Sequence, residues 1–487
     1  MPDTINILFL AAEAYPYIKV GGLADVAGSL PFALRSLSTR QTGGYSLDVR
    51  LVLPIYRLAQ AGVVTLKPLI NFVVSTEEGE IGAQAFEGSL NGVPTYFIDG
   101  FPIARSDYVY SPNPVDDREK YAFFSLAALE LARILNWKVD IVHANDWHTA
   151  LSVYAIRTSK KDPYYSKTAG LLTVHNLPYM GGDNGDLLDK YGFQKLLDKS
   201  VPIWARGQSL PLGLWAADAI VPVSDTYARE ILTPEYGCGL QDFLQSRASV
   251  ITGIINGLDV NQWDPAKDDC IFANYSIDNL KDRSKNKISL LKKIDLDIDP
   301  QIPLIGMVTR IDYQKGIDLT IKALPMLMEK RWQLVILGSG DESLEKELSQ
   351  LQTIYPDRVR VILRYDNSLS HLIYAGSDLF LMPSRYEPCG LSQMIAMRYG
   401  NIPVVHATGG LKDTVLEGKT GFVFEDSNPE SQADSLRKAF KVFTQPEKWL
   451  SFQRSGMKQD FSWTRSAIQY SILYRSIAFK YLHGGEQ

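Results

Sequence analysis

The chain has 487 residues, more than one domain of about 150 residues needs. Hydrophobic residues make up 45% of it and charged residues 22%, an ordinary globular composition that excludes collagen-like and low-complexity proteins. The 50 Lys and Arg against 55 Asp and Glu give a net charge of −5. This balance argues against a general binder of nucleic acid or anionic membranes but permits a local basic pocket.

Short apolar or β-branched runs recur along the chain, separated by stretches long enough for helices. The predicted strands are Ile5–Ala11, Val49–Leu53, Val93–Ile98, Asp140–His143, Gly170–Val174, Ala219–Val223, Val250–Ile255, Pro303–Thr309, Gln333–Leu337, Val359–Leu363, Asp378–Met382, Ile402–Val405 and Gly421–Phe424. The predicted helices include Lys120–Leu135, Ser370–Gly376 and Ser392–Tyr399. This alternation predicts βαβ units and mainly parallel sheets.

The segment between Trp263 and Pro303 is polar and shows the weakest periodicity, so we place a domain boundary just before it. We predict two Rossmann-like, doubly wound α/β domains, residues 1–258 and 259–465. The tail 466–487 has a helical pattern, and we expect it to pack back on the first domain.

The first residues and the cysteines bear on location. The apolar run after Asp3 is short and lacks a basic leader, so we interpret it as a buried strand and not as a signal peptide. The three cysteines form no C-x-x-C pair and no disulfide framework, which favours a reducing compartment. No apolar run approaches the ~18–20 residues that cross a bilayer. We expect a cytoplasmic protein, or a protein of the plastid stroma if a transit peptide has been removed.

Paired glycines occur at two corresponding places. Gly21 and Gly22 enter a predicted helix in the first half, and Gly409 and Gly410 do so in the second. Helix N-termini present backbone N–H groups to anions, and glycine permits close approach. The pairs therefore predict two anion sites, one per domain; two unrelated strand-to-helix turns are the alternative.

Polar residues follow two predicted strands of the first half. Asp146 comes after one of them, and His175 with Asn176 follows the next. Open α/β sheets bind ligands at the carboxyl ends of their strands, so these residues are candidates for a site. A zinc site at His143 and His148 lacks a third convincing ligand, and His175 has a purely structural alternative as a buried hydrogen-bonding group.

Cations and a carboxylate follow strands of the second half. Arg310 and Lys315 suit a diphosphate, with a solvated loop as the alternative. Lys19 in the first half is a further candidate anion contact. Glu387 lies in a strand-to-helix loop, where a carboxylate can accept the hydroxyls of a sugar. Cys389 lies next to it; we favour a buried or substrate-lining role over a nucleophile because no His lies nearby in sequence.

Seven motifs carry a family resemblance: KVGGLADV, HANDWH, TVHNL, INGLD…WDP, TRIDYQKG, SRYEPCGLSQ and ATGGLKDTV. Their order and spacing resemble those of the starch and glycogen synthases, which are retaining glycosyltransferases of family five. The resemblance runs from Ile5 to about Trp463. It implies a GT-B fold, in which two Rossmann-like domains face each other across a cleft.

The resemblance also implies site residues. The implied catalytic residues are Asp146, His175, Arg310, Lys315 and Glu387. The implied substrate-binding residues are Lys19, Gly21, Gly22, Asn176, Asn256, Cys389, Gly390, Leu391, Thr408, Gly409 and Gly410. The implied reaction transfers glucose from ADP-glucose to the non-reducing end of an α-1,4-glucan or maltooligosaccharide.

We expect this reaction to need no cofactor and no metal, and we expect no nucleic-acid or membrane partner; the sequence does not predict an oligomeric state. Two alternatives stay open. One is a related retaining glycosyltransferase that uses UDP-glucose or a small acceptor. The other is a catalytically silent paralogue that binds glucan.

Two positions depart from the family pattern. The usual R-L-x-x-Q-K-G loop is RIDYQKG here, which places Asp312 and Tyr313 beside the cations. The usual Arg-Phe pair is Lys120-Tyr121. A carboxylate next to Arg310 can compete with a phosphate, whereas one that points away would have no effect, so the departures bear on donor affinity and acceptor preference.

Overall fold

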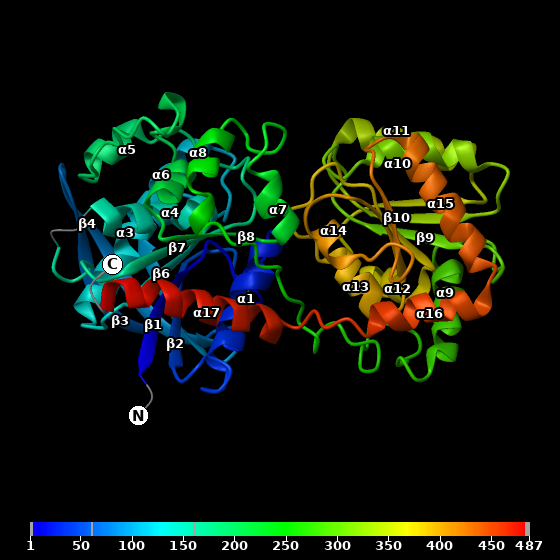
Figure 1. The fold of residues 1–487 in the computed structure, drawn as a ribbon, viewed down its shortest axis with the longest axis horizontal. Helices are drawn as coiled ribbons and strands as arrows, with labels where there is room; N and C mark the ends of the chain where they lie inside the picture. Colours follow the sequence, from blue (N-terminus) through cyan, green and yellow to red (C-terminus); the bar gives the residue numbers. More distant parts are fainter. Residues whose placement is uncertain (1–2, 60–61, 159–161, 483–487) are drawn as a thin grey trace. The chain divides into compact units, whose positions relative to one another are not determined.

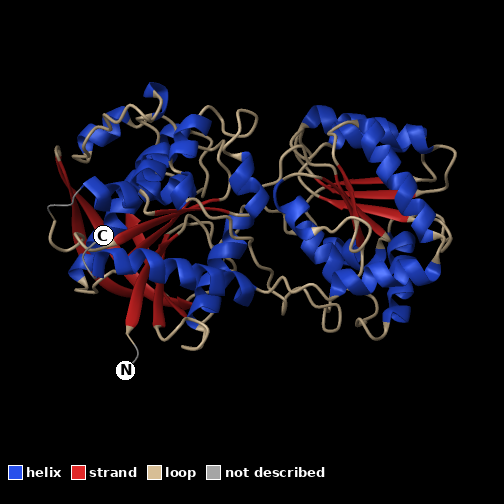
Figure 2. Cartoon of the chain, viewed as in Figure 1, coloured by secondary structure: helices blue, strands red, loops and turns tan. Residues whose placement is uncertain are grey.

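The computed structural model describes residues 3–59, 62–158 and 162–482, and the chain folds into two compact units (Figures 1 and 2). Unit 1 comprises residues 1–257 and 463–487, and unit 2 comprises residues 258–462. Unit 2 is thus inserted in sequence between the main part of unit 1 and its last helix. Among the described residues, no helix is both long and apolar enough to cross a bilayer.

Unit 1 contains an eight-stranded sheet in the order β3-β4-β5-β2-β1-β6-β7-β8. Its strands are β1 (Thr4–Leu10), β2 (Ser46–Pro54), β3 (Lys67–Thr76), β4 (Gly79–Leu90), β5 (Val93–Gly100), β6 (Ile141–Asn145), β7 (Ala169–Val174) and β8 (Ala219–Pro222). The pairs from β5 to β8 across the sheet are parallel, whereas β3 with β4 and β4 with β5 are antiparallel. The strand order reverses between β1 and β6, which places a ligand crevice at their carboxyl ends.

Helices cover both faces of this sheet, with α1 and α17 on one side and α3, α4 and α6 on the other (Figure 1). The helices of unit 1 are α1 (Gly22–Arg35), α2 (Phe101–Ala104), α3 (Pro114–Ile134), α4 (Asp146–Thr158), α5 (Gly185–Lys190), α6 (Ser209–Ala216), α7 (Asp225–Glu230), α8 (Gln241–Ser246) and α17 (Trp463–Leu482). Local chemistry explains the start of α3. The Asn113 side chain accepts from the Val115 N–H at 3.2 Å, and Pro114 occupies the first helical position.

The last helix, α17, packs on the sheet of unit 1 and is joined to it by buried hydrogen bonds. The Tyr474 hydroxyl lies 2.6 Å from Nδ1 of His143 on β6. The Nε2 atom of the same histidine lies 2.8 Å from the Thr173 hydroxyl on β7, which lies 3.3 Å from the Tyr470 hydroxyl. Because a buried polar group needs a partner, α17 satisfies side chains that the sheet alone leaves unpaired.

Unit 2 contains a six-stranded parallel sheet in the order β11-β10-β9-β12-β13-β14. Its strands are β9 (Leu304–Val308), β10 (Gln333–Gly338), β11 (Val359–Leu363), β12 (Leu379–Met382), β13 (Ile402–His406) and β14 (Phe422–Phe424). Numbered from β9 as the first strand, this is the 3-2-1-4-5-6 order of dinucleotide-binding domains, whose switch point lies between β9 and β12.

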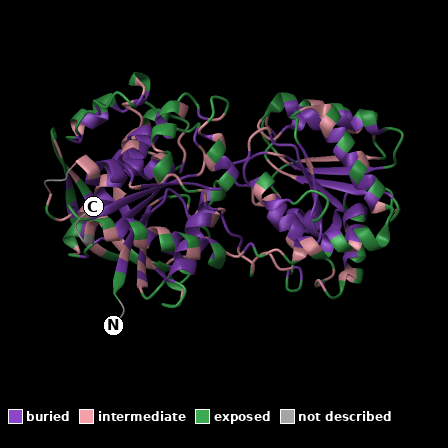
Figure 3. Ribbon diagram, viewed as in Figure 1, coloured by how far each residue is buried: buried purple, intermediate pink, exposed green. Residues whose placement is uncertain are grey.

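The helices of unit 2 are α9 (Arg283–Lys293), α10 (Ile317–Ala323), α11 (Glu342–Ile354), α12 (Asn367–Gly376), α13 (Ser392–Arg398), α14 (Gly409–Thr414), α15 (Pro429–Phe443) and α16 (Pro446–Met457). Alternate residues of β10 enter two different cores. Leu334 and Ile336 join the core beneath α10, α11 and α15, whereas Val335 and Leu337 join the core beneath α9 and α12. Apart from the edge strand β11, the strands are largely buried on both faces, and the helices are exposed on their outer faces (Figure 3). This two-sided burial explains why these strands are continuous apolar runs in the sequence.

The fold departs from the sequence prediction at two places in unit 1. The antiparallel hairpin of β3 and β4 was not predicted. The segment Val250–Ile255, predicted as a strand, runs beside β8 but forms a single bridge, Ile220 with Ile251. It donates from Thr252 and Ile254 to carbonyl oxygens of that strand, and a full ladder does not form.

Candidate active site

The candidate residues of unit 2 lie at the switch point of its sheet. Arg310 and Lys315 follow β9, and Glu387 follows the neighbouring strand β12. Parallel strands end at the same edge, so the topology brings two cations and a carboxylate to one crevice. This is the arrangement that the sequence predicted for a phosphate and a sugar.

Lys315 and Glu387 are in direct contact. The Lys315 ammonium donates to Glu387 Oε2 at 2.6 Å, and the Ser384 hydroxyl donates to the same oxygen at 2.9 Å. The carboxylate is buried and the ammonium nearly so. Among the described residues, Oε2 accepts both of these hydrogen bonds and Oε1 accepts none. A carboxylate oxygen is a suitable acceptor for a sugar hydroxyl. The contact fixes both side chains in the crevice before any ligand arrives.

Arg310 is the more exposed cation. Its Nη1 atom lies 3.2 Å from Asp312 Oδ2, and its Nη2 atom donates to Gln314 Oε1 at 3.2 Å. The Asp312 side chain, which the RIDYQKG departure places in this loop, thus points toward the cation and not away from it. Gln314 in turn donates to the Tyr386 carbonyl at 3.0 Å and so links this loop to that of Glu387.

The Gly409–Gly410 turn packs tightly against the Glu387 loop. A methyl group at Gly409 would lie 2.0 Å from the Glu387 carbonyl oxygen, and one at Gly410 would lie 2.1 Å from that of Cys389. Gly409 also has a φ of +42°, a left-handed conformation that favours glycine. These glycines allow the two strand-end loops to approach each other.

The remaining candidates of unit 2 belong to the same pair of loops. Cys389 is buried, as expected for a lining residue, and Gly390 has a φ of +72°. Leu391 precedes α13 as its N-cap, and Thr408, also buried, precedes α14 in the same way. The structure therefore brings all nine candidates of this unit to one edge of the sheet.

In unit 1, Asp146 lies where β6 meets α4 and adopts a left-handed φ of +55°. Its Oδ1 atom accepts the backbone N–H of His175 at 2.7 Å and that of Asn176 at 3.3 Å. Burial raises the pKa of this carboxyl to about 7, although the two backbone hydrogen bonds oppose the shift and the Glu13 charge adds to it. Left-handed backbone conformations and raised carboxyl pKa values are both common at functional sites.

His175 is held as a neutral ring. Burial lowers its pKa to about 3. The Asn145 amide donates to the Leu10 carbonyl at 2.9 Å, which orients its Oδ1 toward His175 Nε2 at 3.0 Å. Because Oδ1 can only accept, Nε2 of His175 carries the proton.

Two candidate asparagines have unused acceptors. The side-chain oxygens of Asn176 and Asn256 are buried, and neither has a hydrogen-bond partner among the described residues. Buried polar atoms are nearly always paired, so an orphaned amide oxygen points to a ligand donor such as a sugar hydroxyl. The contacts of unit 1 join Asn176 to Asp146 and His175, whereas no described hydrogen bond joins Asn256 to them.

The loop of Lys19, Gly21 and Gly22 rests on Glu13, which sequence analysis did not identify. The buried Glu13 carboxylate accepts the backbone N–H groups of Val20 and Gly21, the latter at 3.0 Å, and the Tyr110 hydroxyl at 2.8 Å. Burial raises the pKa of Glu13. An acidic residue at the end of the first apolar strand was the signal for it, because strand ends are where polar groups serve the site.

Lys19 itself, 41% exposed, pairs with Asp25 at 2.7 Å. Around Gly22 the backbone is open, since a methyl group there would meet no atom within 4 Å. At Gly21 the nearest atom would be Glu13 Oε1 at 3.2 Å. This loop therefore leaves room for a ligand beside the start of α1.

The chain is similar to known proteins over nearly its whole length. Residues 6–246 match a family described as starch synthase catalytic domain, and residues 291–450 match glycosyl transferases group 1. Glycogen synthase of Syntrophotalea carbinolica is 39% identical over 484 residues, covering 97% of this chain and 98% of that protein. Glycogen synthase of Clostridium beijerinckii is 38% identical over 488 residues, covering 97% and 99%. The chain belongs to the starch/glycogen synthase family.

Solved structures agree with the starch/glycogen synthase assignment. The catalytic domain of starch synthase IV from Arabidopsis thaliana, bound to ADP and acarbose, matches with a TM-score of 0.87 at 32% identity, covering 98% of this chain and 100% of that chain. Sucrose-phosphate synthase from Thermosynechococcus elongatus matches with a TM-score of 0.62 at 17% identity, covering 97% and 99%, a likeness of fold alone. The chain is a glycosyltransferase with the GT-B fold, and the predictions of family and fold class are confirmed.

The second departure from the starch/glycogen synthase pattern has a structural explanation. Lys120 is fully buried, pairs with Asp117 at 2.6 Å, and donates to the carbonyls of Tyr108 and Val109 at 3.0 and 2.8 Å. Burial lowers the pKa of this lysine, and the Asp117 charge opposes the shift. Lys120 thus supports the segment that carries Tyr110 to Glu13.

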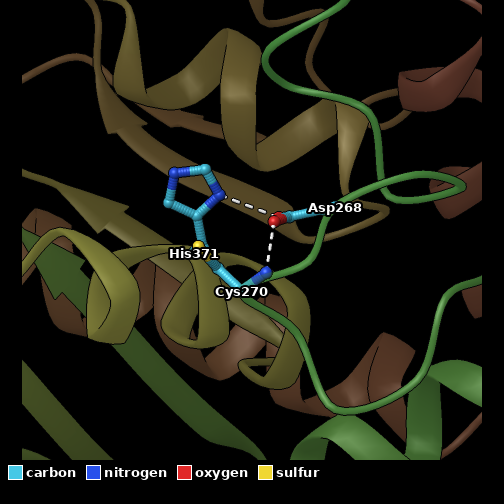
Figure 4. A group of neighbouring side chains, drawn as sticks. All are labelled: Asp268, Cys270 and His371. Carbon is cyan, nitrogen blue, oxygen red and sulfur yellow. Dashed lines mark hydrogen bonds and ion pairs between the residues drawn. The ribbon is translucent and has the colours of Figure 1, made fainter.

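A cluster of Asp268, Cys270 and His371 offers three potential ligand atoms within 4.8 Å of one another (Figure 4). Asp268 Oδ2 lies 2.8 Å from His371 Nδ1 and accepts the Tyr399 hydroxyl at 2.6 Å, while Oδ1 accepts the Cys270 N–H at 2.8 Å. The His371 ring stacks on Trp263 with centroids 4.3 Å apart. Both carboxylate oxygens are engaged, so in this family member the cluster fastens the segment before α9 to helices α12 and α13.

Proposed function

We propose that the chain transfers glucose from ADP-glucose to the non-reducing end of an α-1,4-glucan or maltooligosaccharide, with retention of the anomeric configuration. The contact of Lys315 with Glu387 beside Arg310, at the switch point of unit 2, carries this proposal. The starch synthase IV domain, solved with ADP and acarbose, supports an adenine nucleotide as the donor. The family's glycogen synthases support a glucan as the acceptor.

Departure of ADP builds negative charge on the β-phosphate. Arg310 and Lys315 are assigned to stabilise it, together with the backbone of the Gly409–Gly410 turn, which packs against the Glu387 loop. The loop contacts of these two side chains keep both cations in the crevice before the donor binds. In this proposal Lys315 exchanges part of its contact with Glu387 for the phosphate.

The sugar is assigned to the carboxylate and amide oxygens. Glu387 accepts hydroxyls of the donor glucose, and the orphaned oxygen of Asn176 is a second acceptor in unit 1. Asp146 fixes the His175–Asn176 backbone and lies at the carboxyl end of β6. The bond from C1 to the phosphate oxygen breaks, the acceptor 4-hydroxyl attacks C1 from the same face, and its proton passes to the departing phosphate. Isolation of a glycosyl–enzyme adduct from intact protein would contradict this route.

A donor and acceptor panel tests the proposal. Labelled ADP-glucose and UDP-glucose are each offered with glycogen, with maltooligosaccharide and with no primer. We expect incorporation from ADP-glucose into both glucans. Equal or better use of UDP-glucose would favour the related-transferase alternative, and retained glucan binding without incorporation would favour the silent paralogue.

A matched pair of variants tests the residues. Arg310→Ala is expected to lower kcat by about 10²–10³, the usual cost of removing one contact to transition-state charge. Arg331→Ala is the control, because Arg331 is an equally exposed arginine paired with Asp299 at the opposite end of the sheet. Equal rates for the two variants would remove Arg310 from the site.

Location belongs to the same proposal. No disulfide joins the described cysteines Cys238, Cys270 and Cys389, which supports a reducing compartment such as the cytoplasm, or the plastid stroma. Fractionation of the source cells with an antibody to the chain tests it.

A further inference from the structure

The three cations assigned to the donor each face a carboxylate of their own unit. Lys19 pairs with Asp25, Lys315 with Glu387 and Arg310 with Asp312. In unit 2 the two cations and two carboxylates carry no net charge together. A diphosphate must therefore compete with carboxylates that are already in place.

Asp312 differs from a mobile surface acid because its own side chain is fixed. Its Oδ1 atom accepts the Lys315 backbone N–H at 2.8 Å, which closes a turn and leaves Oδ2 facing Arg310. The Arg310 side chain is 60% exposed and that of Asp312 27%, so the pair is open to a ligand from solvent. Gln314, itself held by the Tyr386 carbonyl, positions the other end of the guanidinium.

We propose that Asp312 is a built-in competitor for the donor diphosphate: it holds Arg310 in the free protein, weakens binding of the nucleotide and speeds release of ADP. The inference rests on the proposed function, in which Arg310 contacts the diphosphate. The competitor acts by charge, since a phosphate oxygen approaching Arg310 meets the Asp312 carboxylate within contact distance. Because exposed pairs are screened by water and salt, the effect is modest, about two- to fivefold in affinity.

Asp312→Asn isolates the charge. Asparagine keeps an oxygen that can accept the Lys315 N–H, so the turn is preserved while the negative charge is lost. We expect the Kd for ADP, measured by titration calorimetry, to fall about two- to fivefold at low salt, with a slower ADP off-rate. The gain should shrink as ionic strength rises, which a purely structural change would not produce. Asp312→Ser, which also offers a turn-closing oxygen, should give the same direction.

Asp299→Asn is the matched control. Asp299 accepts a backbone N–H two residues on with Oδ1 and pairs with Arg331 through Oδ2, and the two side chains are 30% and 67% exposed. The substitution removes the same charge from the same unit, at an aspartate that also combines one backbone N–H with one arginine, away from the carboxyl ends of the strands. Its ADP affinity should equal that of the parent chain. Tighter binding in this control would mean that net charge alone explains the effect, and the inference would be overturned.

A double-mutant cycle with Arg310→Ala completes the test. If Asp312 acts through Arg310, Asp312→Asn tightens ADP binding in the parent chain but changes it much less in the Arg310→Ala background. If Arg310→Ala weakens ADP binding while Asp312→Asn leaves it unchanged or weaker, the competitor is refuted and the proposed function stands. If Arg310→Ala leaves ADP binding intact, Arg310 does not contact the diphosphate, and the proposal that Asp312 competes with the diphosphate for Arg310 is refuted as well.

Discussion

The two paired-glycine turns look alike in sequence but have different surroundings. Gly409 and Gly410 are required by the fold, because any side chain there would collide with the backbone of the Glu387 loop. Gly22 has no neighbour within 4 Å in the direction of a side chain. Steric necessity thus explains the pair in unit 2, whereas the space beside the pair in unit 1 is left for a ligand.

The carboxylates of the two units differ in a parallel way. In unit 1, Glu13 and Asp146 are buried and accept backbone N–H groups, and burial raises the pKa of both. In unit 2, Glu387 and Asp312 are paired with cations. We therefore expect pH to change the charge of the buried carboxylates in unit 1. In unit 2 we expect anions that compete for the cations to weaken the ion pairs, and salt to do so at the exposed pair of Asp312.

The largest effect is expected at Gly410. Gly410→Ala places a methyl group 2.1 Å from the Cys389 carbonyl oxygen, so the backbone of one loop must move. We expect unit 2 to lose about 1–3 kcal/mol of stability, as for other overpacked sites, with loss of ADP binding. Scanning calorimetry and ADP titration measure both. Unchanged stability would show that the loops can separate at little cost, and would end the contrast with unit 1.

The next effect concerns Asp146. Because its pKa is raised to about 7 in the fold, the unfolded chain loses this proton first as pH rises. The contribution to stability is full below about pH 4 and is lost as pH rises through about 7. Asp146→Asn keeps the shape and tolerates the left-handed conformation but does not titrate. Its free energy of unfolding, relative to that of the parent chain, should therefore rise by roughly 1–4 kcal/mol from pH 4 to pH 8.

The activity of Asp146→Asn tests whether this carboxylate also serves catalysis. We expect Asp146→Asn to lose most of its kcat even where it is the more stable protein, because a carboxylate binds the His175 and Asn176 N–H groups more strongly than an amide oxygen and so holds that backbone more firmly. A variant as active as the parent at every pH would reduce Asp146 to a structural support. A stability difference that does not change with pH would contradict the raised pKa.

The smallest effect is expected at Gly22. Gly22→Ala lies in the first turn of α1 and meets no atom, so the free energy of unfolding should stay within about 0.5 kcal/mol of the parent value. If a ligand approaches this backbone closely, KM for the donor or the acceptor should rise about tenfold. Initial rates on ADP-glucose and glycogen measure this, and unchanged kinetics would make Gly22 an ordinary helix start.

Sequence reasoning found the strands that are marked by apolar runs and missed the β3–β4 hairpin, which has none. Strands such as Leu304–Val308 are continuous apolar runs and were found from them. The hairpin Lys67–Thr76 and Gly79–Leu90 alternates buried and exposed residues and contains many polar and small side chains, so no apolar run marked it. Alternation of apolar and polar residues with a period of two, in a segment of low overall hydrophobicity, is the pattern that would have predicted this hairpin.

The site shows a similar division. Arg310, Lys315 and Glu387 were predictable because charged residues immediately after buried strands must lie at one sheet edge. Glu13 also follows a buried strand, but its role as the support of the Lys19 loop was missed because its partners there are backbone N–H groups, which every residue possesses. The orientation of Asp312 toward Arg310 likewise depends on which way one turn closes.

The buried hydrogen bonds of α17 have a consequence for the order of events during synthesis. All strands and helices of unit 2 precede α17 in the chain, so unit 2 holds every element of its own fold before α17 is synthesised. Unit 1 begins first but finishes last, because His143 and Thr173 wait for Tyr474 and Tyr470. A chain truncated before α17 therefore contains every element of the second unit but an incomplete first unit, so we expect loss of α17 to destabilise unit 1.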